Sequence, residues 1–302
     1  MSAGSCPSCG LVSFHPYQMN LLRCNACNLV VDSAVWKGSI NQILEEDWFA
    51  DDYDPQMSSW VKRFENWNNH RTFNRLTSIH LRGRRLLEIG VGSGSFLGYM
   101  QQRGFDVVGC DLSESICKKA ARKYQVCVHH GQIWDIPEMG QFDIVVLNHV
   151  LEHTDDPLKF LTCIKRKLNK KGVVHIAVPN INCWEACLSG WNSYEPYHLL
   201  YFTPETLRST VQRAGFVIAH EATRESFSGW YLALLRTLRS MRHDRSLYRY
   251  SKRKTKRDSW IEHPYRIGMV TSGLMTFPIR LLQGWLGKGD EIVVLGQLQN
   301  GC

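Results

Sequence analysis

Between residues 84 and 179, short apolar runs alternate with amphipathic segments, and this alternation restricts the fold more than any other feature of the 302-residue chain. Short apolar runs rich in β-branched residues indicate buried strands, and longer segments with apolar positions at helical spacing indicate helices. The expected strands are 85–90, 105–110, 126–130, 142–148, 172–179, 216–223 and 291–298. The expected helices include 96–103, 115–123, 157–168 and one that begins at Pro204 behind a Thr203 cap. Repeated strand–helix units favour a doubly wound α/β fold, in which ligands bind at the carboxyl edge of a parallel sheet.

The turn after the first of these strands has the features of a nucleoside site. Gly90, Gly92 and Gly94 allow a sharp bend and let a ligand approach main-chain amides at a helix start. Asp111 ends the second strand, where a carboxylate can accept hydrogen bonds from both ribose hydroxyls. A dinucleotide would satisfy these residues equally well. Glu88 favours a different ligand, because a negative charge beneath the loop repels a pyrophosphate and attracts an ammonium and a sulfonium.

Four segments, LEIGVGSGSF, GCDLS, FDIVVLNHVLEHTDDP and LNKKGVVHIAVPN, resemble in this order the motifs of class I S-adenosylmethionine-dependent methyltransferases. The resemblance covers roughly residues 84–223, with a terminal strand at 291–298, and implies a Rossmann-like seven-stranded sheet. It also implies a set of cofactor contacts, in which Glu88, Gly90, Gly92 and Gly94 line the methionine end, Asp111 holds the ribose, Leu112, Gln132, Ile133 and Trp134 surround the adenine, and Asn148 and His149 face the methyl donor.

Two CxxC pairs near the N-terminus predict a metal site. Cys6 and Cys9 form the first pair and Cys24 and Cys27 the second, with 14 residues between them. Each CxxC turn directs two sulfurs at one ion, and a hairpin between the pairs would complete a tetrahedral four-cysteine zinc site. Four protein ligands leave no open position for catalysis, so we expect the zinc to be structural. A redox pair and incidental spacing are the alternatives, and the sequence leaves open whether the ribbon braces the domains or docks a partner.

Five residues after the fourth strand and in the loop 191–202 are candidates for contact with the methyl acceptor, namely His149, Glu152, His153, Tyr197 and His198. Methyl transfer needs a base only if the acceptor must lose a proton. The Glu152–His153 pair resembles one found in relatives that act on quinones and sugars. In these relatives the pair often shapes the loop or touches the substrate. Glu152 and His153 could therefore have a purely structural role in the loop. If one of them acts as an acid or a base, His153 is the better candidate, because its unperturbed pKa is near neutral.

The net charge of +8 is concentrated in one stretch. Residues 236–257 contain ten Lys or Arg and a single acid, Asp244, with aromatic residues close by. An amphipathic helix at 230–241 precedes most of this stretch, and an apolar helix at 269–286 follows it. Three interpretations compete: a solvated helical cover, a surface that contacts anionic lipid, and a nucleic-acid contact.

Together these patterns predict a zinc ribbon at 1–35, an aromatic-rich helical cap or linker at 36–80 with a helix near 58–76, a methyltransferase core at 81–224 and 290–302, and a basic helical insertion at 225–289.

Hydrophobic residues at 44% and charged residues at 21% exclude a disordered chain. The polar N-terminus does not read as a signal peptide, and residues 266–286 are too interrupted to span a membrane. We therefore expect a cytoplasmic protein, with peripheral membrane contact as an option.

The expected function is transfer of a methyl group from S-adenosylmethionine to a small molecule such as a sugar, a quinone or a lipid-linked metabolite. An RNA methyltransferase, using the ribbon and the basic stretch, is the main alternative. A catalytically inactive module that only binds the nucleoside is a third hypothesis, and intact cofactor motifs argue against it.

Overall fold

The computed structural model describes residues 4–36, 59–79, 81, 83–136, 141–195, 197–225, 229–240, 268 and 271–298. Its centre is a seven-stranded sheet with the order β10-β11-β8-β7-β4-β5-β6. The strands are β4 (Arg85–Ile89), β5 (Asp106–Asp111), β6 (Cys127–His130), β7 (Phe142–Asn148), β8 (Leu168–Pro179), β10 (Phe216–Arg224) and β11 (Glu291–Leu298). Neighbouring strands from β8 to β6 are parallel, whereas β11 runs antiparallel to both β8 and β10. The predicted doubly wound α/β class is confirmed.

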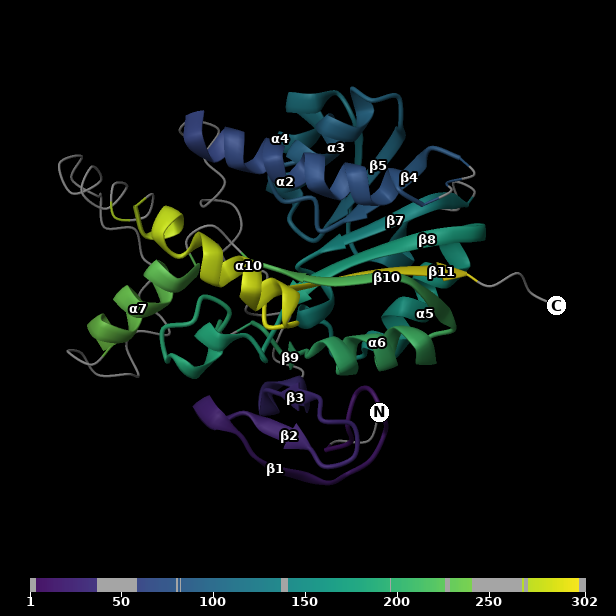
Figure 1. Ribbon diagram of the computed structural model, residues 1–302. Helices are drawn as coiled ribbons and strands as arrows, with labels where there is room; N and C mark the ends of the chain where they lie inside the picture. The colour runs from purple at the N-terminus through teal and green to yellow at the C-terminus, as the bar shows by residue number, and fades with distance from the viewer. Residues whose placement is uncertain are drawn as a thin grey trace.

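Helices cover both faces of this sheet (Figure 1). They are α2 (Ser59–Thr77), α3 (Ser95–Gln101) and α4 (Glu114–Tyr124) on one face, and α5 (Pro157–Lys167) and α6 (Pro204–Arg213) on the other. The side chains of β4 alternate accordingly, because Leu86 packs with the α2–α3 side and Leu87 with the α5–α6 side. The side chains of Asp156 and Thr203 cap the two helices of the second face, and proline follows each cap. The cap at Thr203 is the one that the sequence predicts.

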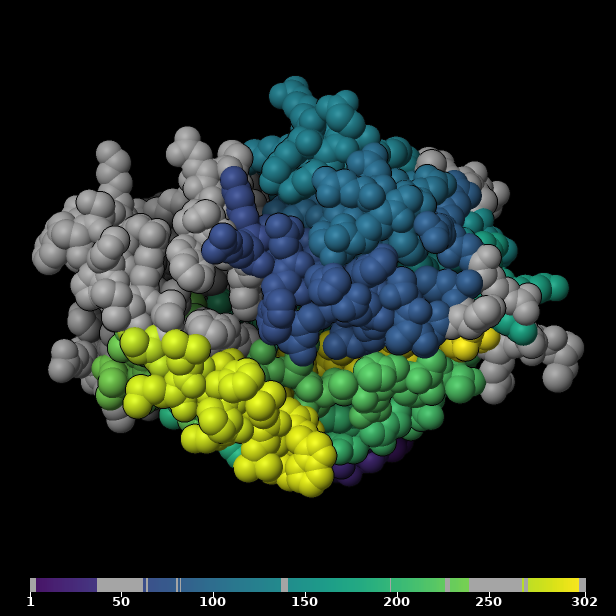
Figure 2. Space-filling model, turned by 45° about the horizontal axis from the view of Figure 1, so that its top comes forward, coloured from purple at the N-terminus to yellow at the C-terminus, as the bar shows by residue number. Residues whose placement is uncertain are grey.

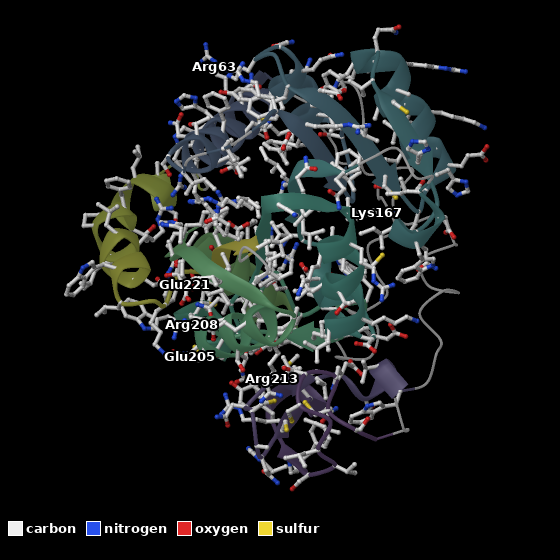
Figure 3. All side chains as sticks on the ribbon, turned by 90° about the vertical axis from the view of Figure 1, so that its right-hand side faces the viewer. Arg63, Lys167, Glu205, Arg208, Arg213 and Glu221 are labelled. Carbon is white, nitrogen blue, oxygen red and sulfur yellow. The ribbon has the colours of Figure 1, made fainter. Side chains whose placement is uncertain are left out.

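The N-terminal cysteine region forms a second sheet against the α5–α6 face. Its strands are β1 (Phe14–Pro16), β2 (Leu22–Cys24), β3 (Val30–Val31) and β9 (Leu200–Tyr201), in that order. Because β9 lies in the loop before α6, this four-stranded sheet joins the ribbon to the core. Arg213 of α6 lies next to the ribbon in Figure 3 and donates to the carbonyl of Ser8 at 3.0 Å.

The insertion before the last strand contains two described helices, α7 (Gly229–Ser240) and α10 (Phe277–Trp285), which lie side by side in Figure 1. The predicted helix at 269–286 is interrupted, since residues 271–275 are helical, Thr276 forms a turn and α10 then begins. The predicted helix near 58–76 is confirmed as α2. Most of the basic stretch, residues 241–257, lies outside the described residues, as do residues 37–58 of the expected cap.

Candidate active site

A cavity of about 1370 Å³ opens at the carboxyl edge of the parallel strands. Ligand pockets in proteins measure about 300–1,000 Å³, so this one has room for a nucleoside cofactor together with a second molecule. One wall is the glycine turn after β4 with the ends of β5 and β6, and the opposite wall is the loop that leads into β9.

The glycine turn forms the floor of the end that the sequence analysis predicts to hold the cofactor. Gly90 and Gly92 line the cavity with positive φ values of 74° and 53°, a region that favours glycine. Gly94 also has a positive φ, 72°, but it is not part of the lining. A Cβ at Gly94 would lie 2.8 Å from the Cβ of Ala120, so this glycine allows α3 to pack on α4.

Two carboxylates meet at this floor. Asp111 accepts the backbone N–H of Ser113 at 2.9 Å and that of Gly92 at 3.3 Å, which fixes its orientation. Burial raises the pKa of the Asp111 carboxyl, although these two N–H groups oppose the shift. Burial also raises the pKa of Glu88 well above its usual value; a contact with Asn148 opposes this and the charge of Asp111 adds to it. Glu88 is 3% exposed and its Oε2 has no hydrogen-bond partner, so the floor can accept a cation.

The other expected cofactor residues also line the cavity, namely Leu112, Gln132, Ile133, Trp134 and Asn148. Ile133 is buried, whereas Leu112 and Trp134 are about half exposed and present apolar surface at the cavity edge. The backbone N–H of Gln132 donates to Asp135 at 2.8 Å and so fixes the short helical turn that carries Trp134. This arrangement leaves an apolar slot beside Asp111 that suits a planar base.

Helix α2 contributes lining residues that the sequence analysis did not single out. Glu65, Asn69 and Thr72 face the cavity, and Asn69 and Thr72 are buried. Ser93 of the glycine turn donates to Glu65 at 3.2 Å, and Asn69 donates to Ser95 at 3.3 Å. The sequence does show polar residues at helical spacing in α2, but nothing in it indicates that they face the glycine turn.

At the other end of the cavity, which the sequence analysis predicts to hold the methyl acceptor and which we call the acceptor end, the ring centroids of His153 and His198 lie 4.9 Å apart. His153 donates through Nδ1 to the carbonyl of Tyr197 at 3.1 Å, and His198 donates through Nδ1 to the carbonyl of Ser193 at 2.7 Å. Carbonyl oxygens only accept, so both imidazoles are held in the tautomer that keeps a lone pair on Nε2. Tyr197 also lines the cavity, and its ring lies 5.2 Å from that of His153.

Glu152 lies behind these imidazoles and is fully buried; it is not part of the cavity lining. Ligand-type atoms of Glu152, His153 and His198 lie within 4.8 Å of one another. Burial alone would raise the pKa of Glu152, but His149 and the two other histidines lower it to about 2. Burial and the neighbouring His153 lower the pKa of His198 to about 3. The cluster therefore combines an ionised carboxylate with a neutral imidazole at physiological pH.

His149 connects the cluster to the last strand. It has a positive φ of 55°, unusual for a residue other than glycine. Its Nδ1 lies 3.2 Å from Oε1 of Glu152, and its Nε2 lies 2.9 Å from Oε1 of Glu291 at the start of β11. Arg224 at the end of β10 contacts the other oxygen of Glu291, and both residues line the cavity. The sequence analysis missed Arg224 and Glu291, because their approach depends on the antiparallel pairing of β10 with β11.

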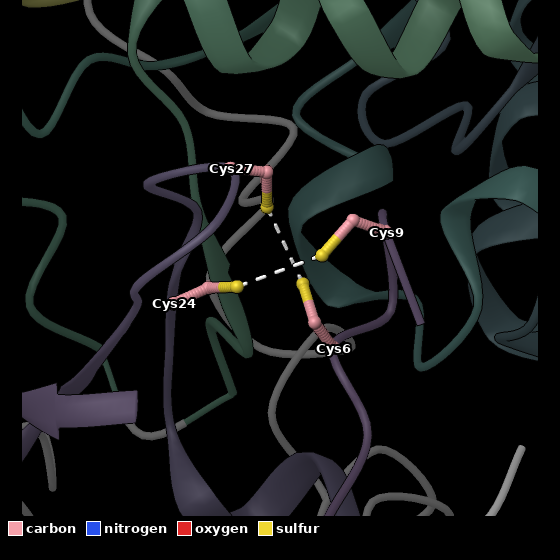
Figure 4. A group of neighbouring side chains, drawn as sticks. All are labelled: Cys6, Cys9, Cys24 and Cys27. Atoms are coloured by element: carbon pink, nitrogen blue, oxygen red, sulfur yellow. Dashed lines mark hydrogen bonds between the residues drawn. The ribbon is translucent and has the colours of Figure 1, made fainter. Parts of the chain in front are cut away.

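The four predicted metal ligands converge in the ribbon (Figure 4). The Sγ atoms of Cys6 and Cys27 lie 3.5 Å apart, those of Cys9 and Cys24 lie 3.6 Å apart, and all four lie within 4.8 Å of one another. A zinc ion with Zn–S bonds of about 2.3 Å places tetrahedral sulfurs about 3.8 Å apart. These cysteines therefore fit a closed zinc site.

Comparison with known proteins agrees with this geometry. The family model described as a methyltransferase domain matches residues 56–221. The ubiquinone biosynthesis O-methyltransferase of Acinetobacter baylyi is 28% identical over 138 residues, covering 38% of this chain and 58% of that protein. Its counterpart in Pseudomonas aeruginosa is 34% identical over 112 residues, covering 34% of this chain and 47% of that protein. The chain spans about half the length of the curated relatives it matches.

A solved structure supports the fold. A proposed sarcosine dimethylglycine methyltransferase from Galdieria sulphuraria superposes with a TM-score of 0.52 at 15% identity, covering 88% of this chain and 96% of that one. The family model covers more than half of the chain, and the sheet order and the cavity at its carboxyl edge agree with it. The chain therefore belongs to the methyltransferase-domain family of S-adenosylmethionine-dependent enzymes.

Proposed function

We propose that this protein transfers a methyl group from S-adenosylmethionine to a hydroxyl of a small acceptor of the quinone, sugar or lipid-linked kind. The observation that carries the proposal is that one cavity joins a carboxylate floor, Glu88 and Asp111, to an imidazole cluster, His153 and His198. The O-methyltransferase names of the two matched bacterial proteins support a hydroxyl as the methyl acceptor.

The residues at the floor fit the cofactor. When bound, S-adenosylmethionine supplies an electrophilic methyl group on a sulfonium. The buried Glu88 carboxylate would pair with the ammonium of its methionine part, and Asp111 would accept the ribose hydroxyls. Leu112 and Trp134 would enclose the adenine, for which the amide of Gln132 offers an edge contact. A bound cation would lower the raised pKa of each carboxyl and so favour the ionised form of both Glu88 and Asp111.

The imidazole cluster would manage the proton of the acceptor. Methyl transfer is an in-line displacement, in which the acceptor oxygen forms a bond to the methyl carbon as the carbon–sulfur bond breaks. The hydroxyl proton must leave, and Nε2 of His153 carries a lone pair that can take it. The ionised Glu152 would stabilise the resulting imidazolium. His198 and Tyr197 would position the acceptor, while His149 would hold Glu152 in place.

We propose that Cys6, Cys9, Cys24 and Cys27 hold a structural zinc ion. The ribbon would brace the acceptor loop through the pairing of β3 with β9. The division of the chain into a ribbon, a helical cap or linker, a core and a basic insertion, with the bounds expected from the sequence, belongs to the same proposal.

We also propose peripheral contact with anionic membranes through residues 230–286. Among the residues that the structure describes, none of the helices has both the length and the apolar character needed to span a bilayer.

The test is methyl transfer from radiolabelled S-adenosylmethionine to a bacterial lipid extract, to polar metabolites and to total RNA, with binding of S-adenosylhomocysteine measured by calorimetry. We expect label in small molecules, and we expect His153→Gln to abolish transfer while leaving the binding heat unchanged. Label in RNA would favour the RNA alternative, which none of the matched proteins named above supports. Absence of S-adenosylhomocysteine binding would refute methyl transfer by this chain.

A further inference from the structure

Helix α10 has its polar and apolar faces reversed with respect to the protein. A helix that packs on a soluble core normally buries its apolar stripe and exposes its polar one. In α10 the buried residues are Arg280 and Gln283. Large apolar residues of α10 and its two flanks are instead exposed, with fractions between 49% and 82%, namely Leu274, Met275, Phe277, Ile279, Leu281, Leu282, Trp285 and Leu286.

Hydrogen bonds hold the helix in this orientation. Gln283 is fully buried, donates to Glu185 at 2.6 Å and accepts from Trp230 of α7 at 3.0 Å. Thr223 of β10 donates to the carbonyl of Gly284 at 2.9 Å. Rotating the helix to bury its apolar face would break these bonds and leave buried polar groups unpaired, which is costly. The apolar face is thus fixed outward.

In Figure 2 the α10 region, drawn in yellow, lies on the outside of the molecule. Monomeric soluble proteins rarely expose apolar patches of more than a few hundred Å², and larger ones mark protein or membrane contacts. Of the described residues, α7 adds Leu234 and Leu238, each about half exposed.

Charge distinguishes between these two kinds of contact. The chain that joins α7 to α10 contains most of the ten Lys and Arg of residues 236–257, whereas the remainder of the protein has a net charge near −1. A second copy of this chain would bring the same positive stretch to the contact and repel it. Anionic lipid head groups attract such a stretch, and apolar side chains with tryptophan enter the interface beside it.

Helix α10 packs beside a strand that reaches the acceptor end of the cavity. The next residue after Thr223 of β10, which bonds to Gly284 of α10, is Arg224. Arg224 lines the cavity and contacts Glu291, which His149 also contacts. A membrane contact through α10 would therefore lie on the element next to the strand that ends at the cavity.

We propose that α10 inserts its apolar face into the surface of an anionic membrane, and that the acceptor enters the cavity from that surface. The lipid contact refines the peripheral membrane contact proposed above by assigning it to α10, and the entry of the acceptor rests on the proposed methyl transfer. Binding scales with buried apolar area and with electrostatic attraction to anionic lipid, so both kinds of change are expected to weaken it.

The experiment is flotation of the full-length protein with vesicles of phosphatidylcholine, alone or with 30% phosphatidylglycerol. We expect binding to the anionic vesicles only, weakened by 0.5 M salt. The double variant Leu281→Ser/Trp285→Ser removes two outward side chains and should bind at least about tenfold more weakly. The matched control Leu11→Ser/Val12→Ser removes two exposed apolar side chains of the ribbon and should bind as the parent does.

Equal binding of parent and Leu281→Ser/Trp285→Ser, or binding that ignores lipid charge, would overturn the proposal. A parent that is dimeric by light scattering, and that this variant converts to a monomer, would show that a second copy covers α10. Calorimetry with S-adenosylhomocysteine separates the two hypotheses: a protein that binds this ligand but not vesicles keeps the proposed function and loses only the membrane contact.

Discussion

Loss of the proposed zinc is expected to loosen the acceptor loop while leaving the cofactor floor intact. The change is Cys24→Ser, which removes a fully buried ligand from the four-cysteine group. The ribbon reaches the acceptor loop through β3, whose residues Val30 and Val31 pair with Tyr201 and Leu200 of β9. Structural zinc contributes directly to folding of its module, so we expect β3 to lose its fixed position.

The magnitude follows from the bonds that hold the loop. Besides the short β3–β9 ladder, the backbone N–H of Asp32 donates to the carbonyl of Leu199 at 2.9 Å. Hydrogen bonds of this kind contribute about 1 kcal/mol each, so losing two or three lowers the free energy of opening by about 2–3 kcal/mol. Each 1.4 kcal/mol corresponds to about tenfold in an equilibrium. Amides of residues 199–202 should therefore exchange about 30- to 150-fold faster with deuterium.

Hydrogen exchange read by mass spectrometry measures this without a known acceptor. The matched control is Cys127→Ser, which changes an exposed cysteine of β6 far from the ribbon in the fold. We expect Cys24→Ser to speed exchange at 199–202 and to leave exchange at 86–94 and the affinity for S-adenosylhomocysteine unchanged. Unchanged exchange at 199–202 in a zinc-free protein would refute the bracing role. Equal acceleration in both segments would refute its confinement to the acceptor side.

Three further outcomes can be checked on the cofactor side. Asp111→Asn should weaken S-adenosylhomocysteine binding by at least about tenfold in calorimetry, because bonds to a charged acceptor contribute about 1.5–3 kcal/mol. Binding of S-adenosylmethionine should release protons and tighten as pH rises, since a cation favours the ionised form of carboxyls whose pKa is raised; Glu88→Gln should reduce this dependence. Gly94→Ala should lower the free energy of unfolding by about 1–3 kcal/mol more than Gly287→Ala, which has the same φ of 72° but no atom within 4 Å of the added Cβ. Equal urea midpoints for these two variants would contradict the packing role.

The core sheet could be predicted because its information is local. Each parallel strand is an apolar run bounded by polar or glycine residues, and the predicted Thr203 cap accepts the backbone N–H of Thr206 as expected. The ribbon sheet could not be predicted in full. Its fourth strand, β9, is two residues long and lies about 170 residues beyond β3, so no local pattern indicates the pairing. The division of the helix expected at 269–286 was also not predicted, although Pro278, which has no backbone N–H to donate, is a local signal for a new helix start.

The candidate site divides in the same way. Glu88 and Asp111 follow a strand–turn–helix pattern that fixes their positions within a few residues, so the sequence was sufficient to bring them together. The contacts of His149 with Glu291 and of α2 with the glycine turn arise from packing between distant segments. Neither contact has a sequence signal apart from the presence of polar residues.

The cofactor floor and the acceptor end differ in how the fold assembles them, and this difference affects the function of the protein. The cofactor floor is built on the turn after β4 and on the end of β5, adjacent parallel strands whose register fixes Glu88 and Asp111 at one edge. The acceptor end is assembled from four separate segments: the end of β7, the loop before β9, the start of β11 and the end of β10. Each of these segments is held by long-range contacts, including those with the ribbon. A change in any one of them can therefore reshape the acceptor end without disturbing the floor. Selectivity for the acceptor is thus expected to reside in those long-range contacts. His198 directly precedes Leu199, which accepts a hydrogen bond from Asp32 of the ribbon, and Arg224 directly follows Thr223, which donates to α10. These two cavity side chains therefore adjoin the contacts that the ribbon and α10 make with the core.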